Sequence, residues 1–112
     1  MSKRQPKLLI EDILESAYKI LDYTRGLSFD HFINDSKTVD AVIRNFEIIG
    51  EAASKLPEDF KEAHPSIDWH RIKGFRNRIV HEYFGIDHSI VWQIKESFLP
   101  DLIIQMKEIE FE

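Results

Sequence analysis

Apolar side chains recur every three or four residues along most of the chain, and this spacing constrains the fold more than any other feature. In residues 6–25 the apolar positions fall on one side of a helix and the charged positions fall on the other. The same spacing returns at about 37–56, at 69–84 and from residue 87 onwards. No useful length of sequence alternates apolar and polar residues as a half-buried strand would. The pattern therefore predicts an all-α protein.

Glycine and proline are scarce, with four of each in 112 residues, which suits long helices and few turns. Short helical pieces are expected around Phe29 and after Pro57, and Pro100 is expected to kink the last helix. Together these elements predict one domain over residues 1–112, an antiparallel four-helix bundle with a short extra helix. The expected helix stops and caps are Gly26, Asp35 or Ser36, Pro57, Asp68, Gly85 and Asp87.

Composition excludes several classes of function. There is no cysteine, so disulfides and thiolate chemistry are excluded. The sequence has neither an apolar run of about 18 residues, as a membrane span needs, nor a signal-peptide core. We therefore expect a cytoplasmic protein without a membrane partner. The formal net charge is -5, so any contact with nucleic acid must depend on a local basic patch.

The third predicted helix carries such a patch. No acidic residue occurs between Asp68 and Glu82. A solvated helix face is the ordinary explanation of such a block. Because each helical residue turns about 100°, Arg76 and His81 lie roughly 140° apart around one helix. They would line opposite walls of a groove, or meet one ligand if a second chain completed the site. The basic residues of the block are His70, Arg71, Lys73, Arg76, Arg78 and His81.

These residue types suit cleavage of a phosphodiester bond in RNA. An imidazole with an ordinary pKa of about 6.5 can remove the proton of a 2′-hydroxyl or return one to the leaving oxygen. An arginine fork can stabilise the charge on the phosphoryl oxygens. Neither step requires a metal ion or another cofactor. One histidine in each chain is too few for an acid–base pair, and a dimer would supply the second.

The segment FRNRIVHEY contains the pattern Arg76-Asn77-x-x-x-His81-x-Tyr83. It resembles the Arg–His signature of the HEPN superfamily, and its His-x-Tyr ending resembles the HepT-like branch. Three further segments, RNFEIIGEAASKLP, HPSIDWHRIKGFRN and GIDHSIVWQI, resemble that branch in the same order. The resemblance therefore covers nearly the whole chain.

The resemblance implies a HEPN-like helical homodimer whose motif helices face each other across the two-fold axis. It implies a metal-independent RNA endonuclease that acts as the toxin of a toxin–antitoxin pair. Arg76 and His81 would match the catalytic pair, and Asn77 would match the polar residue that supports it. Tyr83 would match the tyrosine to which a partner nucleotidyltransferase of the MNT type, the antitoxin, adds AMP.

Other polar residues admit more than one role. Arg71, Lys73 and Arg78 are candidate contacts to RNA phosphates, and His70 is a weaker one. The carboxylates Glu47 and Glu51 lie four residues apart on the second predicted helix. They could bind a metal or act as acid and base. Ion pairing with Arg44, Lys55 or the arginines of the third helix is the expected role.

The remaining histidines and the tryptophans carry less information. His31, His64 and His88 are too far apart to predict a metal site and are expected at the surface or at helix ends. Trp69 and Trp92 are expected to anchor the core.

Two other functions remain open at this stage. One is a non-catalytic module that binds a nucleotide or a partner and acts with a nucleotidyltransferase. The other is a purely structural dimer adaptor. The acidic net charge favours these two functions mildly, while the Arg–Asn–His–Tyr set favours the ribonuclease.

Overall fold

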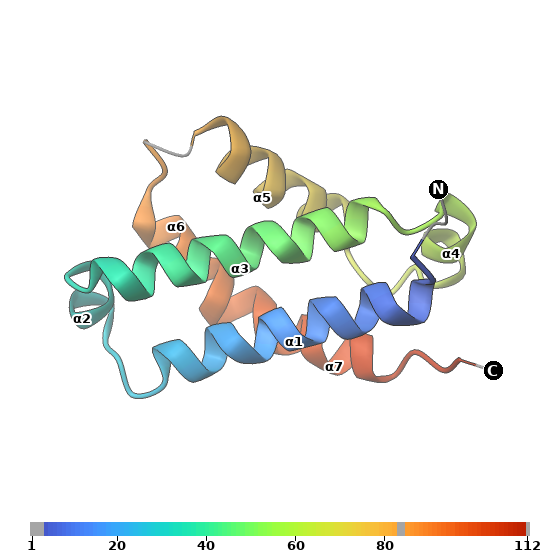
Figure 1. Cartoon of the computed structure of the whole chain (residues 1–112), viewed down its shortest axis with the longest axis horizontal. Coiled ribbons are helices and arrows are strands. Elements are labelled where there is room, and N and C mark those ends of the chain that lie inside the picture. Colours follow the sequence, from blue (N-terminus) through green and yellow to red (C-terminus); the bar gives the residue numbers. More distant parts are fainter. Residues whose placement is uncertain (1–3, 83–84, 112) are drawn as a thin grey trace.

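Two long antiparallel helices form the base of the fold, α1 (Pro6–Thr24) and α3 (Ser36–Ser54). The structure, a computed structural model, describes residues 4–82 and 85–111. The short helix α2 (Phe29–Ile33) lies in the connection between the two long ones, at the end of the molecule opposite α4 (Figure 1). The described residues are helical or irregular and include no strand, which confirms the predicted all-α class.

The rest of the chain packs on this pair. The short helix α4 (Glu58–Ala63) leads into α5 (Trp69–His81), which lies along α3 (Figure 1). The chain then returns through α6 (His88–Gln93), a π-helical turn η1 (Ile94–Phe98) and α7 (Leu99–Lys107), and α7 packs against α1. The four main helical stretches match the predicted bundle. The connections contain the two short helical pieces that were expected, α2 at Phe29 and α4 after Pro57.

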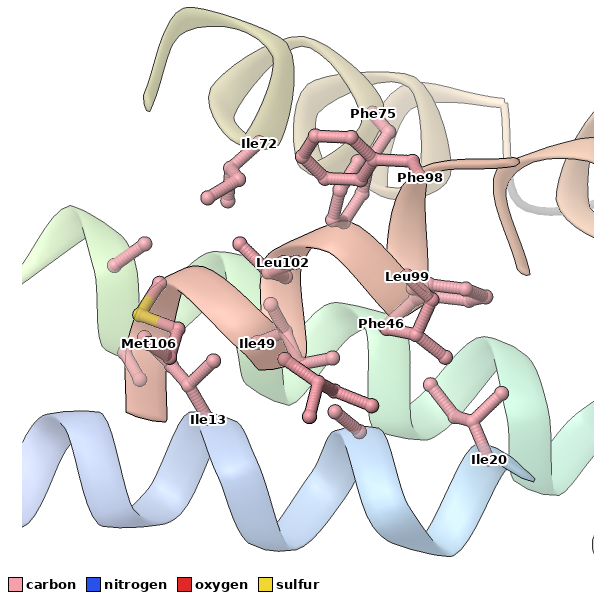
Figure 2. Close-up of a cluster of buried hydrophobic side chains, with 14 of the residues drawn as sticks. Ile13, Ile20, Phe46, Ile49, Ile72, Phe75, Phe98, Leu99, Leu102 and Met106 are labelled. Carbon is pink, nitrogen blue, oxygen red and sulfur yellow. The ribbon is translucent and has the colours of Figure 1, made fainter. Parts of the chain in front are cut away.

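A shared apolar core holds the helices together. Figure 2 shows Ile13 and Ile20 from α1, Phe46 and Ile49 from α3, and Ile72 and Phe75 from α5 meeting Phe98, Leu99, Leu102 and Met106. Each fully buried side chain of this kind stabilises the fold by roughly 1.5–3 kcal/mol. The ring of Phe75 packs edge-on against those of Phe46 and Phe98, at centroid distances of 5.4 and 6.0 Å. The core therefore fixes the position of α5 relative to α3.

The helix caps largely agree with the sequence prediction. Asp35 accepts a hydrogen bond from the Thr38 N–H at 3.3 Å, and Asp68 accepts one from the Arg71 N–H at 2.9 Å. Gly26 has a φ of 76°, a left-handed conformation that glycine adopts without a steric penalty. No helix within residues 4–82 and 85–111 is long and apolar enough to cross a membrane.

Some predicted helix ends are wrong by two or three residues. α3 ends at Ser54 instead of residue 56, because its last turn tightens through a bond from the Leu56 N–H to the Ala53 carbonyl. Helical geometry is also disfavoured at Leu56, because the next residue is a proline. Pro57 is the N-cap residue of α4. α5 ends at His81, whereas the sequence predicted a helix as far as residue 84. Residues 83 and 84 lie outside the described part of the chain.

The last helix differs from the predicted continuous helix with a kink at Pro100. A π-helical turn precedes the proline, and the Leu99 N–H donates to the Ile94 carbonyl five residues back. Pro100 then stands in the first turn of α7, a position at which proline is well tolerated. The irregularity therefore lies one turn earlier than the proline that was expected to cause it.

Candidate functional site

Helix α5 carries most of the predicted site residues. Ile72, Phe75 and Ile79 bury one face of this helix in the core. Arg78 and His81 lie in its last turn, where a positive charge interacts favourably with the helix dipole. Because the apolar face of α5 is buried in the core, its basic side chains lie partly against α3 and partly in solvent.

Arg76 is held by the neighbouring helix α3. Its Nε donates to Glu51 Oε1 at 3.0 Å, and its Nη2 donates to the same oxygen. Its Nη1 donates to Asn77 Oδ1 at 3.3 Å. The Arg76 side chain keeps 30% of its surface exposed, and that of Glu51 keeps 41%. The guanidinium is therefore fixed in direction while it remains accessible.

The carboxylates of α3 take the roles expected of them. Glu51 pairs with an arginine of the third main helix, as predicted. Glu47 pairs with Arg44 at 3.2 Å on the same helix. The two carboxylates thus serve different arginines.

Gly50 allows α3 and α5 to approach at the position of Arg76. A Cβ atom at Gly50 would overlap the Cβ and Cγ atoms of Arg76 and would lie 3.4 Å from its Cα. Any side chain at this buried position would therefore displace Arg76 or push the two helices apart. A glycine inside the apolar stripe of α3 predicts that another helix can approach closely, and the structure confirms this. That the approaching residue is Arg76 was not predicted.

A pocket of about 370 Å³ opens beside this contact, between the end of α3, α4 and the first three turns of α5. Arg76, Asn77, Lys73 and His70 from α5 all contribute to its wall. Lys61 reaches it from α4. The fold thus gathers four of the predicted polar residues around one cavity.

The other predicted residues point elsewhere. His81 is exposed in the last turn of α5 and does not line the pocket. The guanidinium of Arg71 lies over the Phe98 ring at 4.6 Å, and Arg78 pairs with Glu82 at 3.0 Å. Tyr83 lies outside the described residues.

Two residues near the pocket were predicted differently or not at all. Lys61 was missed, because nothing in the spacing of a proline-bounded connection links it to a helix that begins eight residues later. Trp69, expected as a core anchor, is half-buried and also forms part of the pocket wall. Its Nε1–H is shared between the carbonyls of Lys61 at 3.2 Å and His64 at 3.0 Å, which fixes the indole.

Within residues 4–82 and 85–111, no three side chains of His, Cys, Asp or Glu are grouped closely enough to hold a metal ion. The candidate site is formed by side chains that include cationic, amide and aromatic groups.

Comparison with known proteins gives consistent results. The sequence model of a family described as "Ribonuclease HepT-like" matches residues 13–109. "Probable ribonuclease HepT" of Thermococcus cleftensis is 42% identical over 100 residues, which cover 89% of this chain and 91% of the relative. Two proteins of Methanocaldococcus jannaschii, each named "Putative RNase", are 41% and 40% identical over 110 and 109 residues. These matches cover 98% and 97% of this chain, and 98% and 90% of the relatives. No solved structure matches the chain.

Proposed function

The chain belongs to the HepT-like ribonuclease family, and on that premise we propose that it cleaves RNA without a metal ion, with Arg76 and His81 as the catalytic pair. The observation that carries this proposal is the fixed guanidinium of Arg76. An arginine has five N–H groups, and three of those in Arg76 are engaged by Glu51 and Asn77. The remaining two are available for a phosphate.

In this proposal Arg76 stabilises the transition state. Negative charge grows on the non-bridging oxygens as the 2′-oxygen of the substrate attacks phosphorus, and oriented N–H donors favour that change. Because Glu51 and Asn77 hold the guanidinium beforehand, little reorganisation is needed when RNA binds. Asn77 supports Arg76 through its side-chain oxygen, in agreement with the role that the motif implies for it.

His81 supplies the proton transfers in this proposal. An imidazole takes the proton from the 2′-hydroxyl, and an imidazolium gives one to the departing 5′-oxygen. The 2′-oxygen–phosphorus bond forms as the phosphorus–5′-oxygen bond breaks, so the products are a 2′,3′-cyclic phosphate and a 5′-hydroxyl. The two steps need two histidines, and each chain offers one at this motif.

A homodimer would provide both histidines. His81 lies outside the pocket that contains Arg76, and the two residues are roughly 140° apart around α5. If α5 faced the α5 helix of a second copy, each Arg76 could share a cleft with the partner's histidine. The neighbouring Val80, an apolar residue that is 45% exposed, suits such a seam. Two-fold pairing is also the commonest form of assembly.

The same proposal includes control by a nucleotidyltransferase. Tyr83 follows His81 by two residues, and the motif implies that it accepts AMP from an antitoxin of the MNT type. The added phosphate would bring negative charge to the basic cleft, compete with RNA for Arg76 and silence the toxin. A Tyr83→Phe variant should then stay active when the nucleotidyltransferase is present.

Cleavage of RNA in EDTA tests the catalytic part directly. The protein should be made in cells that lack the nucleotidyltransferase, and its intact mass should show no AMP. We expect the wild type to cleave and both Arg76→Ala and His81→Ala to be inactive. A dimeric, unmodified wild type that fails to cleave would contradict the proposal and would favour a non-catalytic nucleotide- or partner-binding module.

A further inference from the structure

The pocket beside Arg76 has a charge opposite to that of the whole chain. Lys61, Lys73 and Arg76 contribute three cations to its wall. Two carboxylates lie against them, Glu58 in the same wall and Glu51, which pairs with Arg76 from α3, so one positive charge remains in excess. Glu58 pairs with Lys61 at 3.6 Å, and its side chain is 84% exposed, so water screens its charge. The chain as a whole carries -5. An anion near this surface is therefore attracted to the pocket.

The lining of the pocket is chemically mixed. Gly50, Ala53 and the indole of Trp69 are apolar or aromatic, whereas Lys73 and Asn77 are polar. The indole is already fixed by its N–H bonds to two carbonyls, so it can contact a flat ligand without losing further freedom. A volume of about 370 Å³ lies in the range of small-molecule sites. This combination suits one nucleotide, with its base against the indole and its phosphate near the cations.

We propose that this pocket binds the nucleotide of the RNA substrate adjacent to the bond that is cleaved. Its phosphate lies between Lys73 and Lys61, and its base lies against Trp69. This assignment rests on the proposed function, because Arg76 forms one wall of the pocket and acts on the neighbouring phosphate. Lys73 and Lys61 bind and position the strand, whereas Arg76 acts on the reacting group.

The other cations of α5 are arranged differently. Arg71 covers Phe98, and Arg78 pairs with Glu82, so neither contributes to the pocket. The side chain of Lys61 is only 18% exposed, and its Nζ lies 3.6 Å from Glu58 Oε1, another residue of the pocket wall. The geometry therefore selects Lys73 and Lys61, from all the lysines of the described residues, as the phosphate ligands of this pocket.

Tryptophan fluorescence measures binding without cleavage. The chain has two tryptophans, and Trp92 lies elsewhere, packed on Phe32 at 5.0 Å. A Trp92→Phe variant therefore reports on Trp69 alone. The probes are adenosine 5′-monophosphate and a 2′-O-methyl oligoribonucleotide, which resists cleavage because it lacks a free 2′-hydroxyl. We expect a saturable change in Trp69 emission with both probes, and at least tenfold tighter binding of the oligonucleotide.

A matched pair of lysine variants gives the second readout, and it does not depend on the fluorescent variant. Lys73→Ala should weaken binding of a labelled oligonucleotide about tenfold. It should raise the KM for cleavage by a similar factor with little change in kcat. Lys37→Ala removes the same charge from the first turn of α3, at the opposite end of that helix from the pocket, and should change neither quantity.

The outcomes separate this inference from the proposed function. One outcome would overturn the pocket assignment and leave the ribonuclease intact. The protein would cleave RNA, the Trp69 emission would not change, and Lys73→Ala and Lys37→Ala would have the same oligonucleotide affinity and the same KM. Saturable binding that depends on Lys73, in a protein that never cleaves RNA, would support a nucleotide pocket and overturn the ribonuclease. Equal affinity for the monophosphate and the oligonucleotide would show that the pocket serves a free nucleotide, and would overturn its assignment to RNA.

Discussion

Arg76 on α5 and Glu51 on α3 are joined by two hydrogen bonds, although 25 residues separate them in the sequence. The pair is partly exposed, so its contribution to the free energy of unfolding is about 1 kcal/mol or less. The larger effect of the pair is on the orientation of the guanidinium, because the bonds to Glu51 fix the direction in which the remaining N–H groups of Arg76 point. Glu51 is therefore a positioning residue for the candidate catalytic arginine.

Removal of this carboxylate should impair cleavage more than stability. We expect Glu51→Ala to lower kcat by about 10- to 100-fold, because a displacement of a catalytic group by about 1 Å has an effect of that size. Glu47→Ala is the matched control, since Glu47 lies one turn earlier on α3 and pairs with the exposed Arg44. Steady-state cleavage kinetics and thermal unfolding of both variants provide the measurement.

A double-mutant cycle distinguishes positioning from a general structural effect. In an Arg76→Ala background, the further change Glu51→Ala should have little additional effect on the residual rate. Equal losses of activity in the Glu47→Ala and Glu51→Ala proteins, or additive losses in the cycle, would show that Glu51 does not act through Arg76.

The close approach of α3 and α5 leads to a second prediction, which concerns stability. Gly50→Ala places a Cβ against Arg76, whereas Gly74→Ala on α5 adds a Cβ that meets nothing within 4 Å. Both changes gain similar helix propensity, about 1 kcal/mol. Overpacking should therefore make Gly50→Ala less stable than Gly74→Ala by about 1–3 kcal/mol in chemical denaturation. Equal stabilities would mean that the helices separate at Gly50 without cost.

The cap of α3 should make stability depend on pH in acid. The Thr38 hydroxyl and then the Thr38 backbone N–H donate to Asp35, and these bonds lower the pKa of its carboxyl. Because the pKa is lower in the folded state, the ionised Asp35 carboxylate stabilises the folded protein. This stabilisation is fully present above the ordinary pKa of about 3.9 and is lost as the pH falls through the folded-state pKa. Asp35→Asn keeps a good cap that does not titrate.

Thermal unfolding of both proteins between pH 7 and pH 2 measures this effect. The wild type should lose stability relative to Asp35→Asn as the pH falls below about 4. A difference between the two proteins that stays constant over the whole range would show that Asp35 does not titrate with folding. Asp87, whose pKa is lowered by the Ser89 hydroxyl and then by the Ser89 backbone N–H, should behave in the same way at the start of α6.

Local signals in the sequence predicted most of the fold. Apolar spacing located the four main helical stretches, and the short polar residues Asp35, Asp68 and Asp87 marked where helices begin, because their side chains accept N–H bonds within a few residues. The π-helical turn was not predictable in this way. Its position depends on how residues 94–98 meet the core as well as on Pro100, and the sequence shows only the proline.

The site was predictable only where it follows one helix. Lys73, Arg76 and Asn77 stand together in a basic block, and they do line one pocket. The contribution of Lys61 depends on the packing of α4 against α5, which no local spacing reveals. Gly50 signals a close helix approach in the sequence, but only the structure shows that Arg76 is the residue that approaches it. Conversely, Arg71 looks equivalent to Lys73 in the sequence, and only the structure shows that Phe98 engages it. The pair of Arg78 with Glu82 follows the local i,i+4 spacing.

Cleavage of RNA in EDTA by wild type, Arg76→Ala and His81→Ala tests the central claim most directly. A mixture of the wild type with an excess of His81→Ala adds a sharper arm, since the proposed reaction uses the histidines of both copies and a mixed dimer holds only one of them. We predict cleavage by the wild type, none by either variant alone, and loss of the wild-type activity after subunit exchange with excess His81→Ala. Full activity of either variant, or no cleavage by an unmodified dimeric wild type, would contradict the account.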